Sequence, residues 1–312
     1  MALTLPVSEL ESGARRSAVI ARLSKLPPFH PAAVKLLAIS ASADSEVGDF
    51  ERAFGSDPVL ASDLLQVANS PLFGFRSRVH NLRHAIALLG LDAVSSLAVT
   101  IAMGSYVRSG KSRHAVQTVW AHSLATAIIS QAIGRVLGEP GLSLYTAGLV
   151  HDIGRLGMLN LEGDQYAEVL ARGYYEMEEA LLLETLLFGL THDDAGAFLA
   201  RSWGFPETIC ECVRFHHQAA AAEQGQTTRV VQLACQYATA LDLGELNCAN
   251  RPAEAAEVLP PALRGVAQLE PTALQKQIEE TAREYTGIFT GSGAGARVEA
   301  PRRQPIPIRK YG

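Results

Sequence analysis

The sequence predicts an all-α protein, and three observations support this fold class. No segment sustains the period-two alternation of β-branched residues that marks a strand for more than a few positions. Apolar residues instead recur at helical spacing along most of the 312 residues. The hydrophobic share of 48% comes mainly from Ala, Leu, Val and Ile, with only 6% aromatic residues, which favours helices packed on helices. The length allows one large or two ordinary domains.

The net charge, the hydropathy and the cysteines indicate where the protein acts and which partners it excludes. A formal net charge of -5 removes the electrostatic reason to expect broad binding to DNA or to a membrane surface. No apolar stretch approaches the roughly 18 residues that span a bilayer, and the first residues lack a signal-peptide pattern. The four cysteines (Cys210, Cys212, Cys235 and Cys248) are expected to be reduced. We therefore predict a cytoplasmic protein that binds neither DNA nor a membrane.

A first block of short helices is predicted from about residue 16 to 110, after an N-terminal extension (1–17). Turn residues separate these helices, such as Pro27-Pro28, Asn69-Ser70-Pro71 and Gly90. Asp57 and Pro58 are typical of a helix start, because Asp accepts a backbone N–H at the N-cap and Pro needs no donor at the first helical position.

A second block begins with a long amphipathic helix, predicted over Trp120–Leu137 and ended by Gly138. Its apolar stripe includes His122, which therefore points inward. A buried histidine on such a face is often a core residue bonded to a carbonyl group, so this position alone leaves two interpretations open.

The next predicted helix, from about residue 144 to 159, carries His151 and Asp152 in the middle of an apolar run. Two adjacent polar groups in such surroundings require partners. Asp152 has one candidate partner on the same helix, Arg155, three residues further on. A shared polar pocket formed with other helices is the alternative.

Three more polar positions lie at predicted helix ends. Thr191 resembles the start of a capping box, followed at once by His192. His216 and His217 end a later helix, where the helix dipole alone would explain histidine side chains. Helix-start polarity would likewise explain His192.

The C-terminal part is less specific. Helices are predicted at about 228–243 and 271–287, with residues 246–290 forming a helical extension. From Gly291 the chain is rich in Gly, Pro and Arg, which predicts a disordered basic tail over 291–312. Such a tail is either a solvated terminus or a docking strand for an acidic partner.

Taken together, the inward and helix-end positions give a candidate metal set. Neutral imidazole and carboxylate are ligand types that suit iron, zinc or manganese, and Asp152 could bridge two ions or hold one. The candidate ligands are His122, His151, Asp152, His192, His216 and His217.

Ordered motifs over about residues 18–217 resemble the HDOD domain. They are, in chain order, Leu26-Pro27-Pro28, Asp57-Pro58-Val59-Leu60, Ala68-Asn69-Ser70, the run from Ala85 to Leu91, His151 to Leu156, Phe188 to His192, Gly196, Trp203 to Pro206, and His216-His217. The resemblance implies a multi-helix domain, in which an N-terminal helical half (16–110) packs on an HD-like helical half (115–245).

HDOD domains are relatives of the HD and HD-GYP phosphohydrolases, and the resemblance implies a metal pocket at the six candidate ligands. Cys235 stands where the catalytic relatives have a later Asp, which changes the charge and the preferred metal of such a site. Arg155 replaces the usual Lys, and nothing similar to Gly-Tyr-Pro follows His217.

The resemblance favours a non-catalytic signalling module that acts on other signalling proteins in trans. Its His/Asp pocket would bind a divalent metal or a small-molecule ligand. One alternative is a metal-dependent phosphohydrolase acting on a nucleotide or cyclic dinucleotide. Another is a redox or oxygen sensor with an iron site near Cys235.

Overall fold

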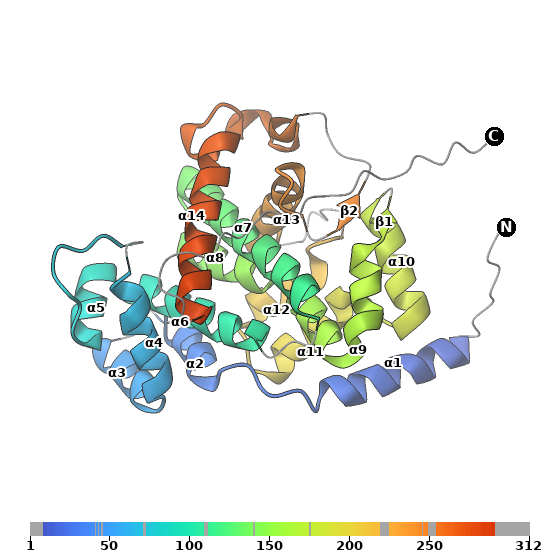
Figure 1. Cartoon of the computed structure of the whole chain (residues 1–312), viewed down its shortest axis with the longest axis horizontal. Helices are drawn as coiled ribbons and strands as arrows, with labels where there is room; N and C mark the ends of the chain where they lie inside the picture. The colour runs from blue at the N-terminus through green and yellow to red at the C-terminus, as the bar shows by residue number, and fades with distance from the viewer. Residues whose placement is uncertain are drawn as a thin grey trace.

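The computed structural model is a helical protein, which confirms the predicted fold class (Figure 1). It describes residues 9–40, 42, 44, 46–70, 73–108, 112–139, 141–174, 176–218, 225–244, 246–248 and 254–290. Within these ranges the strands are β1 (Gly173–Tyr174) and β2 (Asn247–Cys248), which pair in parallel. The predicted basic tail lies outside the described residues.

Short helices form an N-terminal block, as predicted. They are α2 (Pro31–Ser40), α3 (Val47–Gly55), α4 (Pro58–Ala68), α5 (Leu82–Leu89) and α6 (Leu91–Arg108). The side chain of Asp57 accepts the N–H of Leu60 at 2.9 Å, and Pro58 is the first residue of α4, so the predicted cap is confirmed. Asn81 caps α5 in the same way, by accepting the N–H of His84 at 2.9 Å.

A second group of helices, the histidine block, follows. It comprises α7 (Arg113–Leu137), α8 (Gly141–Val150), α9 (Ile153–Ala171), α10 (Met177–Phe188), α11 (His192–Ser202), α12 (Glu207–Phe215) and α13 (Gln226–Ala240). Helix α7 starts earlier than predicted, because its buried stripe extends back to Val116. It ends as expected at Gly138, whose left-handed backbone (φ 72°) lets its N–H bond back to the helix.

The prediction of one helix through residues 144–159 is wrong at its centre. Helix α8 ends at Val150 and α9 begins at Ile153, with Asp152 in a non-helical conformation (φ -100°, ψ 21°) at the N-cap of α9. His151 and Asp152 therefore form a junction between two helices. Tertiary contacts cause the break, since α8 and α9 pack closely against different partners.

Two glycines show how close these partners are. A Cβ atom on Gly148 of α8 would lie 2.9 Å from the Cα of Ala127 in α7. A Cβ on Gly154 of α9 would lie 1.9 Å from the carbonyl oxygen of His192 and 2.6 Å from the backbone nitrogen of Gly196 in α11. The backbones of α9 and α11 thus touch beside Asp152, which fixes the spacing between Asp152 and His192.

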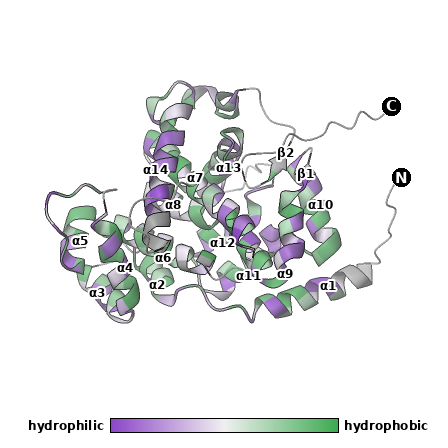
Figure 2. Cartoon of the chain, in the orientation of Figure 1, coloured by the Kyte–Doolittle hydropathy of each residue, from purple (hydrophilic) through white to green (hydrophobic). Residues whose placement is uncertain are grey.

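Of the two terminal helices, the N-terminal one packs on the histidine block and the C-terminal one contacts both blocks. Helix α1 (Glu9–Leu23) runs along α9 to α11, where Arg16 pairs with Asp194 at 2.8 Å (Figure 1). Helix α14 (Pro271–Thr290) contacts α7 of the histidine block as well as α4 and α6. Hydrophilic and hydrophobic stretches alternate along α1 and α14 (Figure 2). The 3-10 turns η1 (Ala255–Val258), η2 (Pro261–Leu263) and η3 (Ala267–Leu269) precede α14.

Among the residues that the structure describes, no single helix has the length and apolarity of a membrane span. Only the bent pair Leu82–Leu89 and Leu91–Gly104 reaches that threshold, across an angle of 115°.

Candidate metal centre

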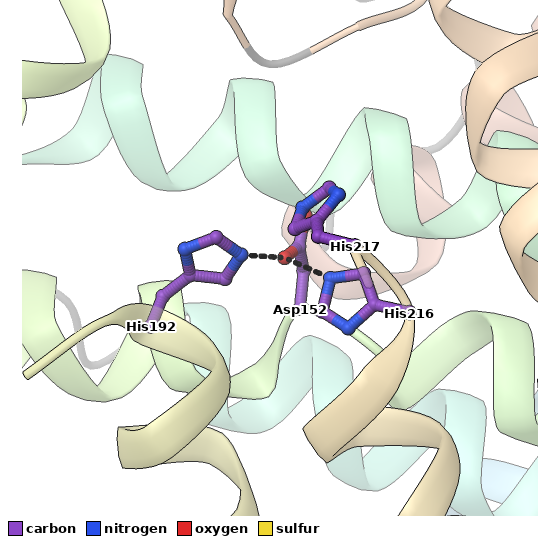
Figure 3. A group of neighbouring side chains, drawn as sticks. All are labelled: Asp152, His192, His216 and His217. Carbon is purple, nitrogen blue, oxygen red and sulfur yellow. Dashed lines mark ion pairs between the residues drawn. The ribbon is translucent and has the colours of Figure 1, made fainter. Parts of the chain in front are cut away.

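Five helical segments bring the six predicted ligands together. His122 comes from the middle of α7, His151 and Asp152 from the α8–α9 junction, and His192 from the first residue of α11. His216 and His217 follow the last residue of α12, and Figure 3 shows both beside Asp152 and His192. All of these side chains are buried except that of His217, which is half-buried.

The carboxylate of Asp152 lies between two sets of side chains. Its Oδ1 is 3.4 Å from the Nε2 atoms of both His192 and His216 (Figure 3). Its Oδ2 is 3.5 Å from Nε2 of His151 and 3.9 Å from Nε2 of His122. The single carboxylate therefore faces both sets of side chains.

We name these sets the His192 half and the Cys235 half. The His192 half consists of His192, His216 and His217, whose ligand atoms lie with one of Asp152 within 4.8 Å of one another. The Cys235 half consists of His122, His151 and Cys235, whose ligand atoms also lie within 4.8 Å of one another. The resemblance placed Cys235 at this site, and the structure brings its Sγ to 3.4 Å from Nε2 of His122.

The imidazole rings are held by their outer nitrogens. Nδ1 of His122 contacts the carbonyl of Leu243 at 2.9 Å, that of His151 the carbonyl of Gly148 at 2.6 Å, and that of His216 the carbonyl of Val213 at 2.9 Å. A carbonyl only accepts, so each of these Nδ1 atoms carries the proton. The Nε2 atom of each ring then points toward Asp152, the arrangement found around protein-bound metals.

Several buried polar atoms at the centre make no hydrogen bond. They are the Nε2 atoms of His151, His192, His216 and His217, Oδ2 of Asp152 and Oδ1 of Asp193. Buried polar groups without partners are costly and rare. Cations bound between these side chains would satisfy such atoms, because carboxylates and neutral imidazoles both offer lone pairs. The donor set therefore fits a divalent metal ion.

Arg155 forms a second buried cluster behind Asp152. Its Nε donates to Oδ1 of Asp152 at 3.2 Å, as the sequence suggested, and its Nη1 donates to Oε1 of Glu184 at 3.2 Å. Tyr166 donates to the same Oε1 at 2.7 Å. Glu184 also accepts the backbone N–H of His192 at 2.8 Å, and its Oε2 lies 2.8 Å from Nδ1 of that ring. Glu184 thereby fixes the position of His192.

The environment shifts the pKa values of the centre in opposite directions. Burial would raise the pKa of Asp152, but Arg155 and the surrounding histidines hold it well below its usual range. Burial lowers the pKa of His151 to about 3 and that of His217 well below its ordinary value. Burial also opposes protonation of His192, yet the negative charges of Glu184 and Asp193 raise its pKa to about 10.

Sequence reasoning missed two carboxylates of this site. Asp193 was not among the candidate ligands, yet its Oδ1 lies 3.0 Å from Nε2 of His192 and 3.6 Å from Nε2 of His216, outside hydrogen-bond geometry. The cap predicted at Thr191 is confirmed, because the Thr191 hydroxyl accepts the N–H of Asp194 at 3.2 Å. Glu184 was not selected, although a lone charge among leucines (LLLETLL) is a signal of a buried partner.

A cavity of about 1020 Å³ reaches the centre from one side. His216, His217 and Cys235 are among its lining residues. Gln232 also lines it, and donates to the carbonyls of Phe215 and Gln218 at 2.8 and 2.7 Å. Since these carbonyls flank the two histidines, Gln232 holds the end of α12 in place.

The fold and this site define a helical protein with a buried His/Asp centre. The model of the HDOD domain family matches residues 26–219. The chain belongs to the HDOD domain family.

Relatives are distant in sequence. A protein of Treponema pallidum (strain Nichols), described as uncharacterized, is 23% identical over 202 residues. The match covers 63% of this chain, and this chain spans about 38% of that relative's length.

Solved structures share the fold. An HDOD domain protein of unknown function from Geobacter sulfurreducens has a TM-score of 0.68 at 23% identity, covering 88% of this chain and 98% of its own. A proposed phosphohydrolase from Shewanella amazonensis SB2B gives 0.61 at 21% identity, with the same coverage. A proposed signal transduction protein from Marinobacter aquaeolei VT8 gives 0.60 at 21% identity, covering 91% of this chain and 65% of its own.

Proposed function

We propose that this chain is a regulatory HDOD protein whose buried centre binds divalent cations. The observation that carries the proposal is the convergence of unpartnered buried nitrogen and oxygen atoms on Asp152. Iron, zinc and manganese all suit imidazole and carboxylate donors. A bound cation would offset the charges of Asp152 and Asp193 and would attract an anionic ligand in the adjoining cavity.

The output we propose is binding rather than turnover. Arg155 is fully buried, and its guanidinium is held by Asp152 and Glu184, so it does not reach a ligand in the cavity. Cys235 supplies a thiol where the catalytic relatives have a carboxylate, so the oxygen ligand that would help to hold a metal-bound water is missing. Both features remove groups that phosphoryl chemistry uses to stabilise developing charge.

The regulatory role requires a partner. We propose that this partner is another signalling protein, bound in trans in the cytoplasm, with a small molecule in the cavity as the signal. The net charge of -5 supports a protein partner over DNA.

A metal-dependent phosphohydrolase is the second candidate. The observation in its favour is that the cavity reaches His216 and His217, so a substrate phosphate has access to the His192 half. A nucleotide or a cyclic dinucleotide would be the substrate class.

One experiment separates the two candidates. Metal content of the full chain is measured by elemental analysis, together with hydrolysis of a generic phosphodiester and of cyclic di-GMP. We expect bound metal in the wild type, loss of metal in Asp152→Asn, and no hydrolysis above background. The matched control is Asp164→Asn, an exposed carboxylate on α9 bonded to Ser112 outside the centre, which should keep its metal.

Two results would contradict the proposal. If the wild type binds no more metal than Asp152→Asn, the centre is not a cation site. Hydrolysis that disappears in Asp152→Asn but persists in Asp164→Asn would establish the phosphohydrolase instead.

A further inference from the structure

The two halves of the centre offer different donor atoms. The His192 half, with Asp152, supplies three imidazoles and one carboxylate. The Cys235 half, with the other oxygen of Asp152, supplies two imidazoles, one carboxylate and one thiol. The sulfur atom is the chemical difference between them.

The side chains of the Cys235 half are buried and their imidazole rings are held in place. Cys235 is 4% exposed, and His122 and His151 are fully buried. Both imidazoles have Nδ1 fixed by a backbone carbonyl, which directs Nε2 inward. Nε2 of His151 and Oδ2 of Asp152 are fully buried and make no hydrogen bond, so the half already contains two donor atoms that lack partners.

Another buried thiol shows that this arrangement is not general. Cys212 is also fully buried, but it clusters with the apolar residues Ala147 and Val231. It belongs to neither group of candidate ligands in the described part of the chain. Burial alone therefore does not explain why Cys235 lies among imidazoles.

We propose that the Cys235 half is a zinc-selective site in which the Cys235 thiolate is a ligand. This inference rests on the proposed function, namely that the centre binds divalent cations. Four donors from His122, His151, Asp152 and Cys235 match the number that zinc takes in tetrahedral sites. When the zinc–sulfur bond forms, the thiol proton is released to solvent.

The selectivity for zinc follows from the softness of the sulfur donor. Thiolate ligands favour Zn²⁺, whereas Mn²⁺ and Mg²⁺ prefer oxygen donors. The His192 half has no sulfur among its ligands, so it should discriminate less strongly between zinc and manganese or iron. The two halves are therefore expected to hold different metals when several are present.

Exchange should also differ between the halves. Both halves reach the cavity, through His217 and Cys235. Every proposed ligand of the Cys235 half is nevertheless at most 4% exposed, while His217 of the other half is half-buried. A chelator should therefore remove metal from the His192 half first. The zinc of the Cys235 half should leave more slowly.

The test uses the full chain, stripped by prolonged chelation and reloaded separately with Zn²⁺, Mn²⁺ or Co²⁺. Metal equivalents are measured, and the cobalt form is examined for a thiolate-to-cobalt charge-transfer band in the near ultraviolet. We expect this band in the wild type and its loss on addition of Zn²⁺. The variants are Cys235→Ser and Cys235→Asp, with Cys212→Ser as the buried-thiol control.

We expect Cys235→Ser to lose the band and to bind zinc at this half more than about 100-fold more weakly. Cys235→Asp should lose the band, keep both metal equivalents, and gain affinity for Mn²⁺, because an oxygen donor replaces sulfur. Cys212→Ser should keep the band. If Cys235→Ser fails to fold, two measurements still test the zinc–thiolate site. They are the cobalt spectrum of the wild type and the relative affinity of Cys235→Asp for Mn²⁺ and Zn²⁺.

The outcomes separate the inference from the proposed function. Failure of the wild type to bind any of the three ions would overturn both. Metal binding without a charge-transfer band would overturn the zinc–thiolate site alone. A band that survives in Cys235→Ser, or one that Cys212→Ser removes, would do the same.

Discussion

The two helical blocks bury different kinds of polar group. In the N-terminal block the buried polar residues among those described are Ser95, Ser96 and Thr100. Their hydroxyls bond to neighbouring groups, such as the carbonyl of Leu36 from Ser95 and that of Ser96 from Thr100. These neutral hydroxyls are ordinary partners in helix packing.

The histidine block instead buries formal charges. Asp152, Arg155 and Glu184 are fully buried, and Asp193 nearly so. Charges in such surroundings are costly unless they are paired, and replacing them by apolar residues often stabilises a protein. The comparison indicates that the N-terminal block is built for stability, while the histidine block retains charges that stability alone does not require.

The largest contrast should come from adding one methyl group to each block. Gly154→Ala should destabilise the chain by more than about 4 kcal/mol, because the new Cβ would overlap the backbone of α11. Gly55→Ala in α3 has nothing within 4 Å of the new Cβ and should change stability by less than about 0.5 kcal/mol. Chemical denaturation measures both. Similar costs at the two positions would show that α9 and α11 separate easily.

Removing one carboxylate charge from each block tests the buried ion cluster. Glu184→Gln should cost about 3 kcal/mol, because it leaves Arg155 buried with less compensation. Glu51, which pairs with Arg83 on the surface of the N-terminal block, is the control, and Glu51→Gln should change stability little. Denaturation of the metal-free protein gives both values. An equally small effect of Glu184→Gln would contradict the cluster's structural role.

Acid should destabilise the histidine block through His151. Burial lowers the pKa of His151 to about 3 in the folded chain, from the ordinary 6.5. Between these values the unfolded chain binds a proton that the folded chain excludes. The free energy of unfolding is therefore unaffected by His151 above pH 6.5. It decreases as the pH falls toward 3, by about 2 kcal/mol at pH 5.

Thermal melting of the metal-free protein at about pH 7.5 and pH 5 measures this loss. His151→Gln, which cannot titrate, should melt with a smaller difference between the two pH values. The N-terminal block contributes no buried histidine among the described residues. An equal difference in both proteins would assign the acid sensitivity to other groups.

Local features of the fold were predictable from the sequence. The caps at Asp57 and Thr191 and the helix end at Gly138 depend on a few neighbouring residues, so their sequence signals are direct. The inward position of His122 followed from helical periodicity in the same way.

Features that depend on distant contacts were not predictable. The break at Asp152 results from close packing at Gly148 and Gly154 against two other helices, which no local pattern records. Glu184 and Asp193 belong to the centre because α10 and α11 fold back on the α8–α9 junction. Three candidate ligands, His122, His151 and Asp152, stood out because polar residues are unusual in apolar segments. The helix-end histidines joined them through their residue type and the family resemblance, and the distances between them could not be inferred.

The carbonyl contacts of the imidazole rings have a consequence for any signal that passes through the centre. Because Leu243, Gly148 and Val213 already hold the rings of His122, His151 and His216, binding an ion requires little rearrangement and little loss of side-chain freedom. Occupancy of the centre would then change the electric field in the cavity more than the shape of its walls. Under the proposed function, we expect a partner to distinguish the metal-loaded from the metal-free protein by this change in charge.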